Sequence, residues 1–242
     1  MFDPFKNLFE KSNLRKIYTP EMSKEGRIKE IDNFVDSVPS SSSHWSTESS
    51  GSYESDPFAR FFWARMESSE NKELFEYLKN KLEGRTLIDL GSNIDFLKRK
   101  KEIKDLGVKD YIAVDRFRNF EGVAERNKDF VDDVNLQLIN NDMLKYVARL
   151  PDNSANFTMS GTGFEIIRSS KYWGYLSEEL HRVMYKDGII FGADSYISDK
   201  DFEDKFKAIV SSESRLNDSK FDLGLGDYIL ERKDDEEKKA IQ

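Results

Sequence analysis

The spacing of hydrophobic residues divides the chain into two patterns. In the first, apolar residues recur every three or four positions, as on one face of a helix. This pattern predicts helices over residues 25–35 and 71–82, and the first of them places Ile28, Ile31 and Val35 on one side. We therefore expect amphipathic helices that pack one face against a larger body.

The second pattern begins where short apolar runs start to alternate with helical stretches. The runs predict strands over residues 86–90, 111–115, 136–139, 155–160, 188–193 and 227–231. The spacing between them predicts helices over residues 94–106, 144–148, 172–185 and 202–210. Strands that are separated by helical crossovers indicate a mostly parallel sheet with helices on both faces. The expected fold class is therefore α/β.

A serine-rich segment lies between the two patterns and cannot bury enough apolar surface to order itself. Trp45 and Tyr53 lie in or beside it, where each would either close over a pocket as a lid or anchor the segment on the body. The expected organisation is an N-terminal helical extension over 1–56 with a flexible loop at about 37–55, an α/β domain over 57–232, and a charged tail over 233–242.

The composition narrows the chemistry. The chain has no cysteine, which excludes disulfides, thiolate zinc sites, iron–sulfur clusters and cysteine nucleophiles. A net charge of −8 argues against a nucleic-acid partner, since proteins that bind nucleic acid usually show a basic footprint. No apolar run approaches the roughly 20 residues that span a bilayer, and no secretory signal pattern opens the sequence. We expect a cytoplasmic protein.

Ligands of an open parallel sheet bind outside the carboxyl ends of its strands, where the strand order reverses. The first predicted strand runs into Asp89-Leu90-Gly91-Ser92-Asn93, where a glycine lets the backbone approach a ligand closely. The second ends at Asp115, which is followed by Arg116. A carboxylate at this strand end can accept hydrogen bonds from two ribose hydroxyls. These two strand ends indicate a ligand that contains a ribose.

The segment from Asp89 to Asn93 resembles the first motif of class I S-adenosylmethionine-dependent methyltransferases, a strand that ends in Asp-Leu-Gly. Later passages, as far as residue 193, are similar to the same family. The resemblance implies a Rossmann-like, seven-stranded sheet and S-adenosyl-L-methionine as cofactor. The family's further glycines are replaced here by Asn93 and Asp95. Asp95 at a helix N-terminus would repel a phosphate, whereas a sulfonium ligand without phosphate tolerates a carboxylate.

The resemblance also implies roles for residues at the other strand ends. Asp142 would meet the adenine amino group, and Met143 would pack on the adenine ring. Asp142 is in addition expected to be the N-cap of the helix that follows. Ten residues are implied to line the cofactor site: Asp89, Gly91, Ser92, Asn93, Asp115, Arg116, Asp142, Met143, Ser160 and Gly161.

Methyl transfer from a sulfonium is an in-line displacement, and positioning can supply most of its acceleration. A general base is optional; the candidates are Glu165 and Tyr53, and Trp45 is a further candidate for lining the acceptor pocket. We expect no metal, because the turn after the fourth strand has no carboxylate before Glu165. The expected acceptor is a small molecule or a saccharide- or lipid-linked group.

Two other functions stay open on the sequence. The replaced glycines fit a degenerate protein of the methyltransferase fold that acts as a non-catalytic binding or scaffold subunit. A dinucleotide oxidoreductase is the third reading, and the absence of a Gly-x-Gly-x-x-Gly motif argues against it. The sequence does not indicate an oligomeric state.

Overall fold

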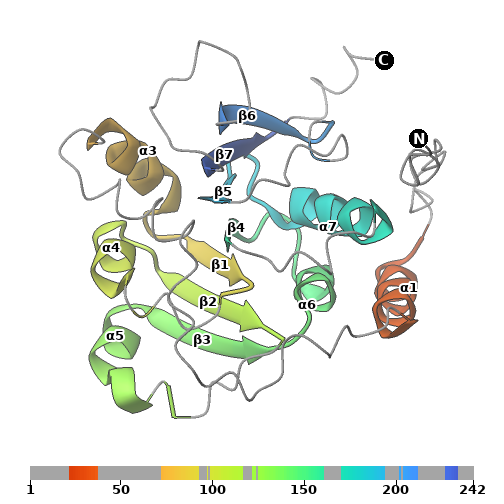
Figure 1. Ribbon diagram of the computed structural model, residues 1–242, viewed down its shortest axis with the longest axis horizontal. Helices are drawn as coiled ribbons and strands as arrows, with labels where there is room; N and C mark the ends of the chain where they lie inside the picture. The colour runs from red at the N-terminus through yellow and green to blue at the C-terminus, as the bar shows by residue number, and fades with distance from the viewer. Residues whose placement is uncertain are drawn as a thin grey trace, which may run out of the picture.

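The computed structural model describes residues 22–37, 72–92, 97, 99–116, 122–123, 125–160, 170–193, 202, 204–211 and 227–233. A seven-stranded sheet forms the centre of the molecule (Figure 1). The strands are β1 (Thr86–Leu90), β2 (Asp110–Asp115), β3 (Asn135–Asn140), β4 (Asn156–Ser160), β5 (Ile189–Ala193), β6 (Phe206–Ser211) and β7 (Asp227–Arg232). The six strands that the sequence predicts are all present, each within one residue of its expected bounds.

The strand order is β3-β2-β1-β4-β5-β7-β6. Strands β1 to β5 are parallel to one another, and their order is that of a doubly wound fold. Strand β7 pairs antiparallel with both β5 and β6. The predicted Rossmann-like, mostly parallel seven-stranded sheet is therefore confirmed. The strand order reverses between β1 and β4, so a ligand is expected at the carboxyl ends of these strands.

Helices cover both faces of the sheet, as predicted (Figure 1). One face carries α3 (Lys72–Leu82), α4 (Lys100–Asp105) and α5 (Lys128–Asp133), and the other carries α6 (Met143–Arg149) and α7 (Ser170–Val183). Each face has its own core. Leu74 and Phe130 are buried with Leu87 of the sheet on the first face, while Leu144 and Leu176 are buried against the second.

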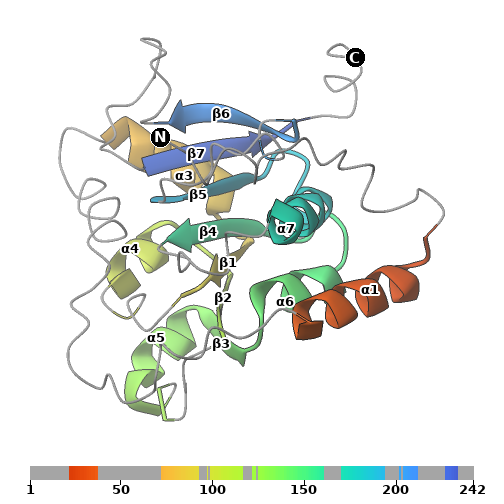
Figure 2. The ribbon, with the colours of Figure 1, turned by 45° about the vertical axis from the view of Figure 1, so that its right-hand side comes forward.

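The N-terminal helix α1 (Lys24–Ser37) lies beside α6 and α7 rather than apart from the sheet (Figure 2). Its Ile31 and Val35 are buried in the same core as residues of β1 and β4, as the helical spacing predicts. Ion pairs join Asp36 to Lys145 at 2.6 Å and Asp32 to Arg149 at 2.7 Å. This pairing sets α1 antiparallel to α6, so the C-terminal end of α1 lies at the carboxyl edge of the sheet.

The helix predicted over residues 202–210 is wrong, because this stretch contains strand β6. The spacing of Phe202 and Phe206 suggests one face of a helix. In the structure Phe206 begins strand β6, and its ring stacks on that of Phe202 with the centroids 5.4 Å apart. A β-bulge between Ala208 and Val210 interrupts the strand. Since a bulge shifts the side-chain alternation by one residue, the strand period is hidden in the sequence.

The helical content around β2 also differs from the prediction. The helix expected over residues 94–106 is present as α4 from Lys100, and residues 93–96 and 98 lie outside the described part of the chain. The N-cap residue Arg99 makes no side-chain capping bond. The short 3₁₀ helix Glu125–Asn127 and α5 precede β3 in a stretch for which the sequence predicts no element. None of the helices in the described part of the chain is long and apolar enough to cross a membrane.

Candidate functional site

The turn after β1 folds across the end of β2. Gly91 has φ of +72°, a left-handed conformation that favours glycine. The backbone amides of Gly91 and Ser92 both donate to the carbonyl oxygen of Val114, at 2.9 and 3.2 Å. The Ser92 hydroxyl is buried and, among the described residues, makes no hydrogen bond of ordinary geometry, although it interacts with the nearby Tyr111 hydroxyl. Because a buried polar group without a partner costs free energy, this hydroxyl is a candidate contact for a ligand.

Asp89 lies one residue before the end of β1 and is half-buried. The Tyr111 hydroxyl, from β2, donates to Asp89 Oδ2 at 2.6 Å. Burial, and then the neighbouring Asp89 carboxylate, raise the pKa of Tyr111 well above its ordinary value. Tyr111 therefore stays protonated and fixes the Asp89 carboxylate as a hydrogen-bond acceptor.

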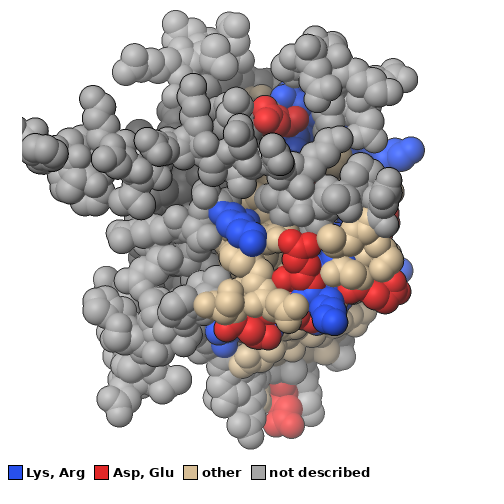
Figure 3. Space-filling view, turned by 90° about the vertical axis from the view of Figure 1, so that its right-hand side faces the viewer, with Lys and Arg blue, Asp and Glu red and all other residues tan. Residues whose placement is uncertain are grey.

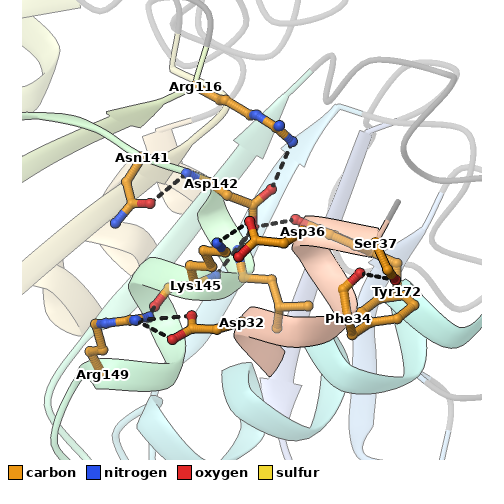
Figure 4. Close-up of polar contacts among 11 residues, drawn as sticks. Asp32, Phe34, Asp36, Ser37, Arg116, Asn141, Asp142, Lys145, Arg149 and Tyr172 are labelled. Atoms are coloured by element: carbon orange, nitrogen blue, oxygen red, sulfur yellow. Dashed lines mark hydrogen bonds and ion pairs between the residues drawn. The ribbon is translucent and has the colours of Figure 1, made fainter. Parts of the chain in front are cut away.

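Strand β2 ends at Asp115, which is half-buried and pairs in register with Asn140 of β3. Arg116 follows and is exposed at the surface. Its Nη1 lies 3.8 Å from Asp142 Oδ2, across the gap between the ends of β2 and β3 (Figure 4). An arginine and a carboxylate from two strand ends thus face each other at the carboxyl edge of the sheet.

Asp142 is buried and caps the N-terminus of α6. Its Oδ1 accepts hydrogen bonds from the backbone amides of Leu144 at 3.0 Å and Lys145 at 3.2 Å, and from the Tyr172 hydroxyl at 3.1 Å. Within the described part of the chain, its Oδ2 pairs with the Arg116 side chain and accepts no hydrogen bond (Figure 4). The expected N-cap role is confirmed, and the second carboxylate oxygen remains available to a ligand.

The other residues expected at the cofactor site differ in where they lie. Met143 is half-buried and packs against the core beneath α6. Ser160 is the last residue of β4 and pairs in register with Ala193 of β5. The lining candidate Trp45 lies outside the described part of the chain. So do four of the predicted site residues, which are Tyr53, Asn93, Gly161 and Glu165.

Two tyrosines that touch the predicted carboxylates were not expected from the sequence. Tyr111 binds Asp89 across neighbouring strands, and Tyr172 reaches Asp142 from the first turn of α7. Tyr111 could have been recognised as a polar residue within an apolar strand. Tyr172 gives no such signal, because its partner is 30 positions earlier and meets it only through packing of α7 on α6.

No metal cluster of three or more histidine or acidic side chains occurs among the residues that the structure describes. The acidic groups at the site are spread over the ends of β1, β2 and β3 and are held by hydroxyl, amide and guanidinium donors. Such separated acceptors suit a ligand that presents several hydrogen-bond donors along its length.

No protein-family model matches the chain, and no curated protein matches it in sequence. The chain resembles several solved structures at low identity. A methyltransferase from Geobacter sulfurreducens is 12% identical over 85% of this chain and 96% of that one, with a TM-score of 0.46. A precorrin-6y C5,15-methyltransferase from Geobacter metallireducens is 15% identical over 69% and 90%, with a TM-score of 0.43.

A Streptococcus mutans protein in complex with SAH is 12% identical over 69% of this chain and 99% of that one, with a TM-score of 0.45. At such identities and TM-scores these likenesses say nothing about activity. The function must therefore be judged from the residues at the carboxyl edge of the sheet.

Proposed function

We propose that the chain is an S-adenosylmethionine-dependent methyltransferase that binds its cofactor at the carboxyl ends of β1, β2 and β3. The observation that carries this proposal is the pair of acidic residues at neighbouring strand ends, Asp115 and Asp142, beside the turn at Gly91. Among the residues that the structure describes, one oxygen of the buried Asp142 carboxylate accepts no hydrogen bond.

The residues fit a nucleoside that carries no phosphate. Asp115 would accept hydrogen bonds from ribose hydroxyls, and Asp142 Oδ2 would accept one from the amino group of the base. The Ser92 hydroxyl, which is buried and makes no ordinary hydrogen bond within the described part of the chain, would bond a polar atom of the ligand. Carboxylates on three strand ends would repel a phosphate, whereas they are compatible with a cationic sulfonium.

S-adenosylmethionine supplies, when bound, a methyl group that an acceptor nucleophile can take by in-line displacement. The contribution of the chain is to hold and orient: the glycine turn, Asp115 and Asp142 fix one reactant at the switch point of the sheet. Holding two reactants in line can supply about 7–11 kcal/mol of the barrier reduction without a side-chain base.

The proposed acceptor is a small molecule or a saccharide- or lipid-linked group. Acidic and basic side chains are interspersed over the face that carries α1, among the residues described (Figure 3). The described residues of this face therefore form no single-sign basic stripe of the kind by which proteins follow a nucleic-acid backbone. The net charge of −8 points the same way.

Titration calorimetry with S-adenosylhomocysteine, the demethylated product, tests the site. We expect Asp115→Ala to weaken binding about 10- to 100-fold, because one or two hydrogen bonds to a charged group are lost. Asp110→Ala is the matched control: Asp110 is at the opposite end of β2, where it accepts hydrogen bonds from Thr86 and Asn135.

The control should retain the affinity of the unaltered chain. Equal losses in both variants would show that the carboxyl end of β2 is not the site. If the unaltered chain binds neither the product nor S-adenosylmethionine, the non-catalytic alternative, a binding or scaffold subunit with a degenerate glycine motif, takes its place.

A further inference from the structure

The two oxygens of the Asp142 carboxylate differ in their hydrogen bonds among the described residues: Oδ1 accepts three and Oδ2 accepts none. Oδ1 receives three donors, two backbone amides of α6 and the Tyr172 hydroxyl. The three donors come from two elements, since both amides belong to α6 and the hydroxyl belongs to α7. Together they leave the carboxylate one orientation, in which Oδ2 faces the Arg116 side chain at the carboxyl edge (Figure 4).

The amides and the hydroxyl have different structural consequences. The two amides would hold any N-cap side chain in place, because capping is a local interaction. The Tyr172 hydroxyl is the one donor to this carboxylate that comes from another helix. Tyr172 is buried, so its hydroxyl cannot exchange this bond for water without a change in packing.

Tyr172 is in turn supported by α1. The Phe34 ring lies 6.4 Å from the Tyr172 ring and 5.2 Å from the Tyr175 ring, centroid to centroid. Asp36, on the same helix, pairs with Lys145 in the first turn of α6. A continuous set of contacts therefore leads from α1 through Tyr172 to Asp142.

We propose that Tyr172 is a positioning residue that orients Asp142 Oδ2 toward the base of the ligand, and that α1 supports it through Phe34. This inference rests on the proposed function. By orienting Asp142 Oδ2, Tyr172 would favour a purine with an amino group at position 6. Oδ2 can accept a hydrogen bond from an amino group, but it is repelled by a carbonyl oxygen at the same position.

The test compares the affinities of the full chain for S-adenosylhomocysteine and S-inosylhomocysteine, which differ at position 6 of the base. Tyr172→Phe removes one oxygen and keeps the ring. We expect it to weaken binding of the adenine compound about tenfold and to leave the inosine compound nearly unchanged, because only the former uses Asp142. The preference for adenine should fall by the same factor.

Tyr175→Phe is the matched control. Tyr175 is also buried, lies one turn further along α7 and packs on Phe34, but its hydroxyl bonds Glu30 of α1 and not Asp142. This variant should keep the preference for adenine. Loss of preference in both variants would assign the effect to the docking of α1 and overturn the role of Tyr172.

A double-mutant cycle with Asp142→Asn separates positioning from a loss of packing. If Tyr172 acts through Asp142, then Tyr172→Phe has no further effect on selectivity in the Asp142→Asn background. Additive effects, or an unchanged preference in Tyr172→Phe, overturn the proposal. Failure of the unaltered chain to bind either compound is a different result, which removes the proposed function and the role of Tyr172 with it.

Discussion

At the scale of single residues, the carboxyl edge of the sheet holds polar groups whose hydrogen bonding is incomplete among the described residues. The Asp142 carboxylate has three donors on one oxygen and none within hydrogen-bond distance on the other. The Ser92 hydroxyl is buried and, among the described residues, makes no hydrogen bond of ordinary geometry. Since buried polar groups in folded proteins are almost always bonded, this hydroxyl marks a place where a ligand is expected, and Asp142 Oδ2 lies at the same edge of the sheet.

Alanine substitutions at two glycines with similar positive φ distinguish an effect on stability from an effect on ligand binding. Gly91 has φ of +72° at the carboxyl edge, and Gly84 has φ of +70° at the amino edge, where an added Cβ would meet nothing within 4 Å. Either glycine-to-alanine change should lower the free energy of unfolding by about 1–2 kcal/mol, because alanine is strained there. Denaturant unfolding measures this loss.

Only Gly91→Ala should also weaken binding of S-adenosylhomocysteine, because its Cβ lies at the turn that approaches the ligand. An unchanged affinity in Gly91→Ala, with the stability loss present, would mean that the turn after β1 does not contact the ligand.

At the scale of elements, α1 is part of the core although it precedes the serine-rich segment. Ile31 is fully buried between α1 and the layer of α6 and α7, and Ile28 is only partly buried beside it. Ile31→Ala should therefore lower the free energy of unfolding by about 2–4 kcal/mol, and Ile28→Ala by much less. Chemical denaturation followed by circular dichroism measures both.

A transition in Ile31→Ala that keeps the midpoint of the unaltered chain would show that α1 is dispensable to the fold. Equal losses in the two variants would contradict the burial of Ile31 as the cause.

The sequence predicts elements well where local pattern and packing agree. The strands at the centre of the sheet are found because their apolar runs are buried on both faces. Strand β6 is missed because a bulge hides its alternation. Helix α5 is missed because it is short and, among its described side chains, only Phe130 is buried in the core. The site carboxylates follow from their place at strand ends, whereas Tyr172 depends on how two helices pack.

At the scale of the whole molecule, the two edges of the sheet have different tasks. At the amino edge, side chains from distant segments of the chain bind one another. Arg85 donates two hydrogen bonds to Asp187. Glu231 accepts a hydrogen bond from the Tyr77 hydroxyl and forms an ion pair with Lys81. These contacts lie away from the candidate site. They stabilise the fold, whereas the polar groups at the carboxyl edge form the proposed binding site.

The Arg85–Asp187 pair predicts a pH dependence of stability. The hydrogen bonds from Arg85 lower the pKa of Asp187 below its ordinary value. A carboxyl with a lowered folded-state pKa stabilises the protein above its unfolded-state pKa of about 3.9, and this stabilisation disappears as the pH falls through the folded-state value. Asp187→Asn should cost less than about 1 kcal/mol at neutral pH, because the pair is largely exposed.

Urea unfolding at several pH values checks this dependence. The difference between Asp187→Asn and the unaltered chain should close as the pH falls through the lowered folded-state pKa of Asp187, and affinity for S-adenosylhomocysteine should be unaffected at neutral pH. A difference that persists in acid would assign the effect of the substitution to packing.

The most direct test of the account is a calorimetric titration of the full chain with S-adenosylhomocysteine, with NAD⁺ as the comparison ligand. Both contain adenosine, but only NAD⁺ carries a pyrophosphate, which the carboxylates at the strand ends would repel. The account predicts saturable binding of S-adenosylhomocysteine at one site, with Kd below about 1 mM, and no binding of NAD⁺. No heat with S-adenosylhomocysteine, or tighter binding of NAD⁺, would contradict it.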